Sequence, residues 1–395
     1  MTVDDKQRLD RTLGPWLFVI LRPLAQVAGK LLRRDHSGAP RGKIVFIKIM
    51  GGGSLLIALP SLLGVRRCFP DRRLTLVCGS PVAPFAKLIG IFDRIDVVND
   101  RGGILALFAS AAHILFGLVR RRVDTVVDLE VHSQLATVFS LLTLARNRIG
   151  FYVSNTYWRR NVLTHLVFFN RARGVFHFYA AAAGLLGAPS AAREQVQKHL
   201  LEEIAATQCS GDYIAIGIGC SDFASVRLLP VKEWQAYASA HREQLSGSCW
   251  IFLGSPADRH ESEAVATAVA EVIPDFSYEN RCGNLSLRES FACIAGARRF
   301  IGIDSALLHA ARALAVPAVS FFGPTDPVTL LEPIVNYFDE VHYRPPICSP
   351  RLHVTQTPPC KGRNVCMELF TRETVPFTPW CEDSAGRSVL PADPI

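Results

Sequence analysis

Residues 300–327 read FIGIDSALLHAARALAVPAVSFFGPTDP and hold two short apolar runs separated by a helical stretch. The first run ends in Asp304-Ser305, and the second ends in a loop that begins at Gly323. Near-continuous apolar strands joined by a helix are typical of a parallel sheet covered on both faces. The stretch therefore predicts a strand–helix–strand unit whose polar residues lie where each strand ends.

The same alternation occupies most of the chain, with one break at residues 188–212. We therefore predict an α/β protein of two Rossmann-like, doubly wound domains facing each other across a cleft. The predicted parts are an N-terminal domain over residues 43–200 and a C-terminal domain over residues 211–340. A basic arm over residues 1–42 precedes them. A Pro-rich C-terminal extension over residues 341–395 is expected to wrap the surface. The predicted strands are 43–49, 74–78, 95–98, 123–129, 148–152, 213–218, 250–253, 300–303 and 318–322.

The composition supports large buried cores in a reducing compartment. Of the 395 residues, 49% are apolar and 20% are charged, which excludes a mainly disordered chain. The 11 cysteines are odd in number and scattered, which favours free thiols over a disulfide framework. Cys348, Cys360 and Cys366 lack a CxxC pair, so loop thiols are favoured over a zinc site.

The N-terminal arm combines positive charge with an apolar stripe. Asp4, Asp5 and Asp10 argue against a signal peptide. Pro15 is predicted to open a helix, and Trp16 beside basic residues is typical of a helix lying on an anionic membrane. A helix packed on the protein's own body is the alternative. The stripe consists of Leu17, Ile20, Leu21, Leu24, Val27, Ala28 and Leu31.

A second apolar stretch covers residues 104–119 and contains no charged residue before Arg120. A membrane-spanning helix needs about 20 residues, so this stretch is short. We predict a buried or half-buried helix that leads into a strand, and a peripheral dip into the bilayer is the alternative.

Two loops carry groups suited to binding phosphate. Asp304 and Ser305 end a strand and begin a helix, and backbone N–H groups at a helix start can hold a diphosphate. His309 lies one turn further along the same face. The loop at residues 323–327 is expected beside it. The Gly51-Gly52-Gly53 turn after the first strand lets backbone approach a ligand, although it is not a dinucleotide fingerprint.

These motifs resemble those of glycosyltransferase family 9, the ADP-heptose:lipopolysaccharide heptosyltransferases. Its Asp-Ser/Thr-Gly-Pro-x-His loop corresponds to residues 304–309, and its Phe-Gly-Pro-Thr-x-Pro loop to residues 322–327. Pro230 matches the proline of a Lys-Arg-Trp-Pro-like element. The resemblance covers residues 43–370, with further matches at residues 128–130, 148–151, 253–256 and 282–287.

The resemblance implies a GT-B fold and an inverting transfer from a nucleotide sugar without a metal or other cofactor. It implies nucleotide binding by the C-terminal domain and acceptor binding by the N-terminal domain. Arg227 aligns with the family's lysine and is predicted to contact the diphosphate. The predicted nucleotide-sugar residues are Gly53, Arg227, Asp304, Ser305, Ala306, His309, Gly323 and Thr325.

One departure concerns the catalytic base. The family's first-strand loop carries an aspartate that acts as the general base, and Ser54 stands in its place. A serine does not accept a proton at neutral pH unaided. Glu130 and His132 follow a predicted strand at its carboxyl end, so either is a candidate replacement. The alternative function is a catalytically impaired homologue that serves as a nucleotide-sugar or glycolipid-binding scaffold.

The predicted partners follow from the resemblance and from the charge. They are a nucleotide sugar donor, with an ADP-sugar favoured and heptose possible as the sugar, a glycolipid acceptor and an anionic membrane surface. The predicted location is the cytoplasm, at the inner face of the cytoplasmic membrane. Nucleic acid is not an expected partner, because no basic groove with interleaved aromatic residues is present.

Overall fold

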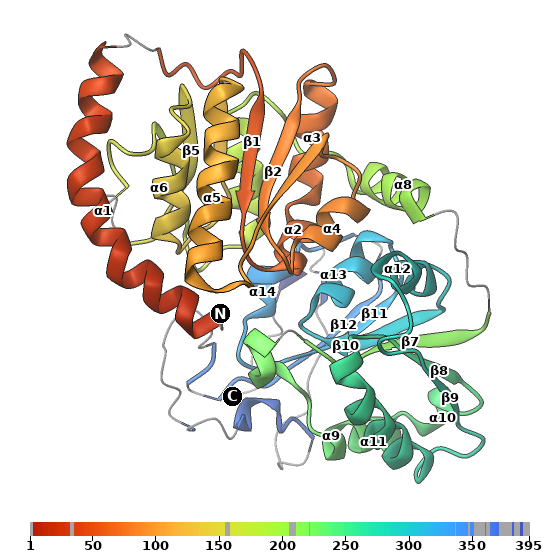
Figure 1. Ribbon diagram of the computed structural model, residues 1–395. Helices are drawn as coiled ribbons and strands as arrows, with labels where there is room; N and C mark the ends of the chain where they lie inside the picture. Colours follow the sequence, from red (N-terminus) through yellow and green to blue (C-terminus); the bar gives the residue numbers. More distant parts are fainter. Residues whose placement is uncertain are drawn as a thin grey trace. The chain divides into compact units, whose positions relative to one another are not determined.

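The structure, a computed structural model, divides into two compact units, Met1–Val196 and Gln197–Ile395. Each unit is described by itself (Figure 1). Arg33 and Arg34 of the basic arm and most of the C-terminal extension lie outside the described residues. The structure describes residues 3–31, 35–154, 159–204, 211–220, 222–335, 337–346, 348–350, 360, 364–370, 381–382 and 388–389.

The first unit is built on a six-stranded parallel sheet in the order β3-β2-β1-β4-β5-β6. All five residues of β1 (Ile44–Lys48) are buried, as expected for an Ile- and Val-rich strand covered on both faces. The other strands are β2 (Leu74–Gly79), β3 (Arg94–Val98), β4 (Thr125–Asp128), β5 (Asn147–Tyr152) and β6 (His165–Phe168).

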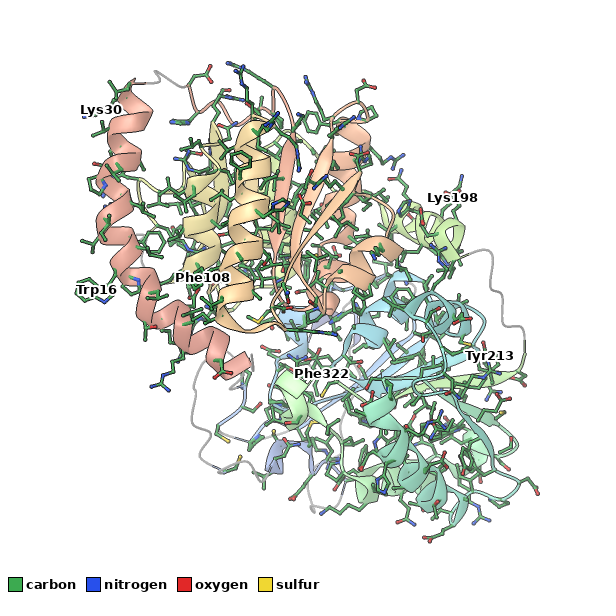
Figure 2. All side chains as sticks on the ribbon, viewed as in Figure 1. Trp16, Lys30, Phe108, Lys198, Tyr213 and Phe322 are labelled. Carbon is green, nitrogen blue, oxygen red and sulfur yellow. The ribbon has the colours of Figure 1, made fainter. Side chains whose placement is uncertain are left out.

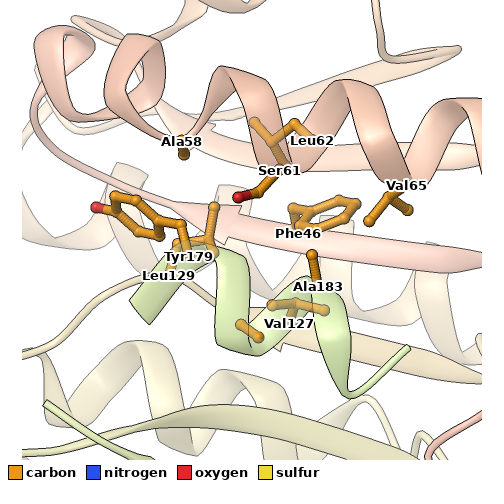
Figure 3. Close-up of a pocket in the computed structure, with 10 residues that line it drawn as sticks. Phe46, Ala58, Ser61, Leu62, Val65, Val127, Leu129, Tyr179 and Ala183 are labelled. Atoms are coloured by element: carbon orange, nitrogen blue, oxygen red, sulfur yellow. The ribbon is translucent and has the colours of Figure 1, made fainter. Parts of the chain in front are cut away.

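Helices cover both faces of this sheet. Ile114 and Leu118 of α5 pack with Val45 and Val126 of the sheet and with Ala136 of α6. The opposite face is covered by α3 and α7, which enclose the small apolar cavity of Figure 3. That cavity is a packing gap and offers no cluster of polar groups. The helices are α1 (Val3–Leu31), α2 (Gly52–Ile57), α3 (Leu59–Cys68), α4 (Ala83–Leu88), α5 (Gly103–Arg120), α6 (Gln134–Leu142), α7 (Val175–Gly184) and α8 (Arg193–Ile204), the last of which crosses the division between the units.

The N-terminal helix α1 packs on the body of the first unit. Phe18 is buried with Val138 and Leu141 of α6, and Leu17 and Leu21 pack against the same cluster. The prediction that Pro15 opens this helix is wrong. The helix begins at Val3, and both Pro15 and Pro23 lie inside it. Asp10 also accepts the backbone N–H groups of Gln134 and Leu135, so the arm is fastened to the start of α6.

The second unit repeats the architecture with a parallel sheet in the order β12-β11-β10-β7-β8-β9. Its strands are β7 (Tyr213–Gly217), β8 (Cys249–Phe252), β9 (Ser277–Asn280), β10 (Arg299–Ile303), β11 (Ala318–Phe322) and β12 (Asp339–Tyr343). Its helices are η1 (Asp222–Arg227), α9 (Val231–Ala240), α10 (Arg242–Leu245), η2 (Pro256–Asp258), α11 (Arg259–Ala270), α12 (Leu287–Ala295), α13 (Ala306–Ala313), α14 (Pro327–Leu330) and η3 (Val365–Met367), and a short pair β13 (Cys381–Glu382) and β14 (Ser388–Val389) follows.

The predicted α/β fold class is confirmed, but three strands of the two large sheets, the short pair β13 and β14, and one buried segment of the tail were not predicted. β6, β9 and β12 were missed; β9 lies at a sheet edge with three of its four residues exposed, so its polar sequence hides the strand. The expectation that the whole tail wraps the surface is wrong for residues 364–370. Cys366, Met367 and Leu369 are buried in the second core, where they add apolar area that the sheet would otherwise expose.

Candidate functional site

Each sheet has one point at which the strand order reverses. This switch point lies between β1 and β4 in the first unit and between β7 and β10 in the second. Loops leaving two neighbouring strands in opposite directions open a crevice at their carboxyl ends, where ligands of such sheets bind. Almost every predicted site residue lies on or beside one of these loops.

In the second unit, Asp304 is the centre of a buried polar cluster. Its carboxylate accepts a hydrogen bond of 2.7 Å from Thr325 Oγ1. Arg227 Nε lies 3.2 Å from Oδ2, and His309 Nε2 lies 3.7 Å from Oδ1. Burial alone would raise the pKa of Asp304, but Arg227, His309 and Thr325 hold this pKa at about 2. Asp304 is therefore ionised at neutral pH and orients three side chains around it.

Arg227 is bound on one side and open on the other. Besides its ion pair with Asp304, it donates a hydrogen bond of 3.2 Å to the Asp304 carbonyl. Its side chain is one-fifth exposed, whereas that of Asp304 is only 2% exposed. A guanidinium carries five N–H donors, so this arrangement leaves donors available for an anion.

Ser305 directly precedes α13, but its side chain does not cap the helix. Its side chain accepts no backbone N–H of the helix, and its buried Oγ has no hydrogen-bond partner among the described residues. Ala306 and Leu307, the first residues of α13, are part-exposed. Uncapped N–H groups and an unsatisfied hydroxyl together suit an anionic ligand.

The neighbouring loop supports this cluster from behind. Thr325 is buried and points its hydroxyl at Asp304. Gly323 packs closely against the tail, because a Cβ there would lie 2.4 Å from Met367 Sδ and 2.7 Å from the Cys366 carbonyl oxygen. The Gly323 carbonyl accepts a hydrogen bond from Ser349. This environment gives Gly323 a packing role.

In the first unit, Glu130 ties the ends of β1 and β4 together. Its Oε1 accepts hydrogen bonds from Lys48 Nζ at 3.2 Å, from the Ile49 amide at 2.7 Å and from the Met50 amide at 3.0 Å. Burial lowers the pKa of Lys48, but Glu130 opposes this effect and the pKa is raised overall. Glu130 therefore holds the first-strand loop in place.

Asp128 and Arg159 form a second buried pair behind this loop. Asp128 accepts hydrogen bonds from Thr137 Oγ1 at 2.8 Å and from the Glu130 amide at 3.0 Å. Burial raises the pKa of Asp128 to about 6, although Arg159 opposes the shift. Arg159 donates to the carbonyl oxygens of Glu130 and Ser133, which fixes residues 130–133. A charged residue placed within or beside an apolar strand was the available signal for such groups.

Ser54 and His132 complete the first switch point. Ser54 Oγ donates to the Gly51 carbonyl at 2.8 Å and hydrogen-bonds Tyr179 of α7. Gly51 adopts φ +84°, a conformation that favours glycine and turns the chain from β1 into α2. His132 is exposed, whereas Glu130 is buried.

The structure thus separates the predicted residues into two groups. The first group belongs to the first unit: Gly53 and Ser54 lie in the first turn of α2, and Glu130 and His132 lie in the loop after β4. The other group belongs to the second unit and surrounds Asp304: Arg227, Ser305, Ala306, His309, Gly323 and Thr325. Lys48, Asp128, Arg159 and Tyr179 were not predicted, because their roles depend on partners far away in the sequence. Among the described residues, no group of three or more His, Cys, Asp or Glu side chains could hold a metal ion.

The sequence profile of glycosyltransferase family 9 (heptosyltransferase) matches residues 117–355, more than half of the chain. This chain belongs to glycosyltransferase family 9. The matched region contains both switch-point loops that follow β4 and β10. The resemblance inferred from the motifs is therefore confirmed.

Two curated relatives match shorter parts of the chain. Lipooligosaccharide heptosyltransferase 2 of Haemophilus influenzae is 30% identical over 101 residues, which is 25% of this chain and 29% of the relative. Lipopolysaccharide heptosyltransferase 1 of Pseudomonas aeruginosa is 34% identical over 102 residues, which is 24% of this chain and 26% of the relative. The matched regions span less than a third of either relative's length.

Solved structures share the fold over most of the chain. The glycosyl transferase family 9 protein from Veillonella parvula has a TM-score of 0.59 at 17% identity, covering 81% of this chain and 89% of its own. The E. coli heptosyltransferase WaaC with ADP has a TM-score of 0.56 at 18% identity, and the match covers 76% of this chain and 92% of WaaC. At these identities the likeness establishes the fold, which confirms the predicted GT-B class.

Proposed function

We propose that this protein is an inverting glycosyltransferase that moves a sugar from a nucleotide sugar to a glycolipid acceptor. The observation that carries the proposal is the cluster around Asp304. It joins an available guanidinium, an unsatisfied hydroxyl and an uncapped helix start at a switch point of the second sheet. Family membership supports a transferase rather than another nucleotide-binding protein.

The second unit is assigned the donor. Arg227, Ser305 and the first amides of α13 would bind the diphosphate and stabilise the negative charge that grows on it as it leaves. Asp304 is a positioning residue in this assignment, because its own charge would repel a phosphate. It fixes Arg227, and it places His309 and Thr325 in the same cluster.

The reaction is a single displacement. The acceptor oxygen attacks the anomeric carbon, the bond from that carbon to the phosphate oxygen breaks, and the nucleoside diphosphate leaves with the bonding electron pair. The acceptor proton passes to a base. Attack opposite the leaving group inverts the anomeric centre. Since side chains and the helix start balance the charge, we propose that no metal is required, and EDTA should leave the rate unchanged.

The base is assigned to the first unit, at Glu130 or His132. Oε1 of Glu130 already accepts three hydrogen bonds, so this buried carboxylate is engaged in holding the first-strand loop. His132 is exposed on the same loop, and a histidine side chain is the group that most often serves as a general base. We therefore favour His132 as the base and Glu130 as the group that positions its loop.

The relatives suggest the substrates. WaaC has been solved with ADP and with ADP-2-deoxy-2-fluoro heptose, and both curated relatives are named as heptosyltransferases of lipooligosaccharide or lipopolysaccharide. We propose an ADP-heptose donor and a lipopolysaccharide-type acceptor. For such an acceptor we propose a location in the cytoplasm, peripherally at the inner face of the cytoplasmic membrane.

A second candidate is a scaffold that binds the same ligands without turnover. Ser54 favours this scaffold, because a serine stands where the family has its catalytic aspartate. The Ser54 hydroxyl is hydrogen-bonded to Gly51 and Tyr179. Ser54→Asp discriminates between the two functions. A scaffold would gain measurable transfer, whereas an enzyme with its base at His132 would keep or lose its rate.

The proposal is tested by thermal-shift and transfer assays. ADP, UDP, GDP and CDP are compared first, since a ligand that binds the folded state raises its stability. The preferred donor is then assayed with a lipopolysaccharide acceptor. Arg227→Ala should abolish the shift, and Arg242→Ala, an exposed arginine of α10, is the matched control. No thermal shift with any nucleotide and no transfer would contradict both candidates.

A further inference from the structure

The N-terminal helix α1 carries two apolar faces, and only one of them is covered. Phe18 packs on α6, with Leu17 and Leu21 beside it. The other face remains in solvent, with side chains spaced three or four residues apart. Its members are Leu13, Trp16, Ile20, Leu24, Val27 and Leu31, of which Trp16 is 72% and Leu31 78% exposed. Figure 2 shows Trp16 pointing away from the neighbouring helices.

The crossover helix α5 has a similar uncovered face. Ile114 and Leu118 are its two buried residues and pack on the sheet. Leu105 is 83% exposed and Phe116 is 67% exposed, and Ile104, Phe108 and Val119 are also exposed. An uncovered apolar face of this length is unusual on a soluble surface, because exposed apolar patches mark sites of interaction.

The two faces belong to one side of the first unit. α1 packs against α6, and α6 shares a buried cluster with α5, so α6 connects the two helices on one side of the unit. Figure 1 shows α1, α6 and α5 in this arrangement. We name the exposed apolar residues of α1 and α5 together the two-helix surface.

Basic residues predominate in the sequence segments that hold the two-helix surface, although α1 also carries Asp4, Asp5 and Asp10 before Leu13. Residues 11–34 contain five Lys or Arg and no Asp or Glu. Residues 101–122 contain four Arg and again no Asp or Glu. Lys30 and Arg120 are exposed at the ends of the two helices. Basic residues bordering an apolar face match an anionic bilayer, which offers headgroup charge outside and acyl chains beneath.

We propose that the two-helix surface docks flat on an anionic lipid bilayer, with α1 and α5 both entering the headgroup region. The basic border favours lipid over a second copy of this chain, because a symmetric pairing would bring the same basic residues together. α5 has the length and composition to cross a membrane, yet it connects β3 to β4 and packs on the sheet. It can therefore present one face and cannot span.

This proposal deepens the proposed function by naming the surface that meets the acceptor's membrane. It is tested without turnover, so its failure is distinguishable from failure of sugar transfer. The full chain is sedimented with vesicles of phosphatidylcholine alone and with vesicles containing 30% phosphatidylglycerol, a composition of roughly the anionic content that attracts basic segments.

Two variants each remove exposed apolar side chains from one of the two helices. One carries Trp16→Ser, Ile20→Ser and Leu24→Ser. The other carries Leu105→Ser, Phe108→Ser and Phe116→Ser. Each should weaken binding to the anionic vesicles at least about 10-fold. The matched control carries Leu201→Ser, Val328→Ser and Val335→Ser, which are exposed apolar residues of the second unit, and should bind like the parent.

A charge variant keeps the test independent of the apolar substitutions. Lys30→Glu with Arg120→Glu should weaken binding at least about 10-fold at low salt, and the parent should bind neutral vesicles about 10-fold more weakly than anionic ones. Unchanged binding by the α5 variant would overturn the two-helix assignment. A parent that ignores vesicles but dimerises in light scattering, with both triple variants monomeric, would show that a second copy covers the surface.

Discussion

The two units place an aspartate at the same topological position and give it opposite properties. Asp128 ends β4 and Asp304 follows β10, and these strands occupy equivalent places in sheets of identical order. Burial raises the pKa of Asp128 to about 6. At Asp304 burial acts in the same direction, but Arg227, His309 and Thr325 hold the pKa at about 2.

The difference follows from the partners rather than from the depth of burial, since both carboxylates are almost completely buried. Arg159 opposes the rise in the pKa of Asp128 and also donates hydrogen bonds to the backbone carbonyl oxygens of Glu130 and Ser133. Arg227 is ion-paired with Asp304 itself. One fold thus provides a structural carboxylate in the first unit and an anionic anchor for cationic and hydroxyl donors in the second.

The largest expected effects concern the two histidines that follow these aspartates in the sequence, His132 and His309. His132→Ala should lower kcat at least about 10²-fold with ADP affinity unchanged, because a positioned base contributes about 10²–10⁴ in rate. His309→Ala should instead weaken ADP binding about 10-fold. Steady-state kinetics and calorimetry with ADP separate these effects.

Glu130→Gln sharpens the same test. The substitution should lower kcat at least about 10²-fold, whether Glu130 is the base itself or the group that positions the base. It should also cost about 3 kcal/mol of unfolding free energy, because buried Lys48 loses its counter-charge. Parent rates in both His132→Ala and Glu130→Gln would contradict a base on this loop, and a parent without turnover would favour the scaffold.

The aspartates themselves should respond in opposite directions. Asp304→Asn leaves Arg227 without its partner and should cost about 3 kcal/mol of stability, together with at least a 10-fold loss of ADP affinity. Asp128→Asn removes a carboxylate that is unfavourable when ionised, so at pH 8 stability should be unchanged or higher and ADP affinity should be unchanged. Equal losses of ADP affinity in both variants would remove the distinction between the two positions.

Asp128 of the first unit and Asp304 of the second should affect the stability in different pH ranges. The pKa of Asp128 lies above the unfolded value of about 3.9, so the folded protein retains an extra proton between about pH 4 and 6. This contribution, about 2–3 kcal/mol, is lost as pH rises through 6. The contribution of Asp304 is present above about pH 4 and is lost as pH falls toward 2. Urea unfolding at pH 5 and 8 should show that Asp128→Asn flattens the decline and Asp304→Asn does not.

The sequence predicts the parts of this comparison that depend on local pattern. Ile- and Val-rich runs predict the central strands, and Asp304-Ser305 before a helix predicts the second switch point. The pairing of Lys48 with Glu130 and the support from Arg159 are not predictable in this way, because each joins segments that only the folded sheet brings together. The sequence also left two alternatives for α1, a helix on a membrane and a helix packed on the protein's own body. In the structure one face of α1 is packed on α6 and the other face is exposed.

The smallest expected effect concerns the hydroxyl that each aspartate binds. Thr325 donates to Asp304 at 2.7 Å, and Thr137 donates to Asp128 at 2.8 Å. Thr325→Val should cost about 1.5 kcal/mol, because hydrogen bonds to charged groups contribute more than neutral ones. Thr137→Val should cost about the same at pH 8, where Asp128 is ionised, and less at pH 5, where it is protonated. Double-mutant cycles with Asp304→Asn and Asp128→Asn measure each coupling. A coupling at Thr137 that does not change between pH 5 and 8 would mean that Asp128 keeps one charge state across this range, and that the two aspartates are more alike than their surroundings indicate.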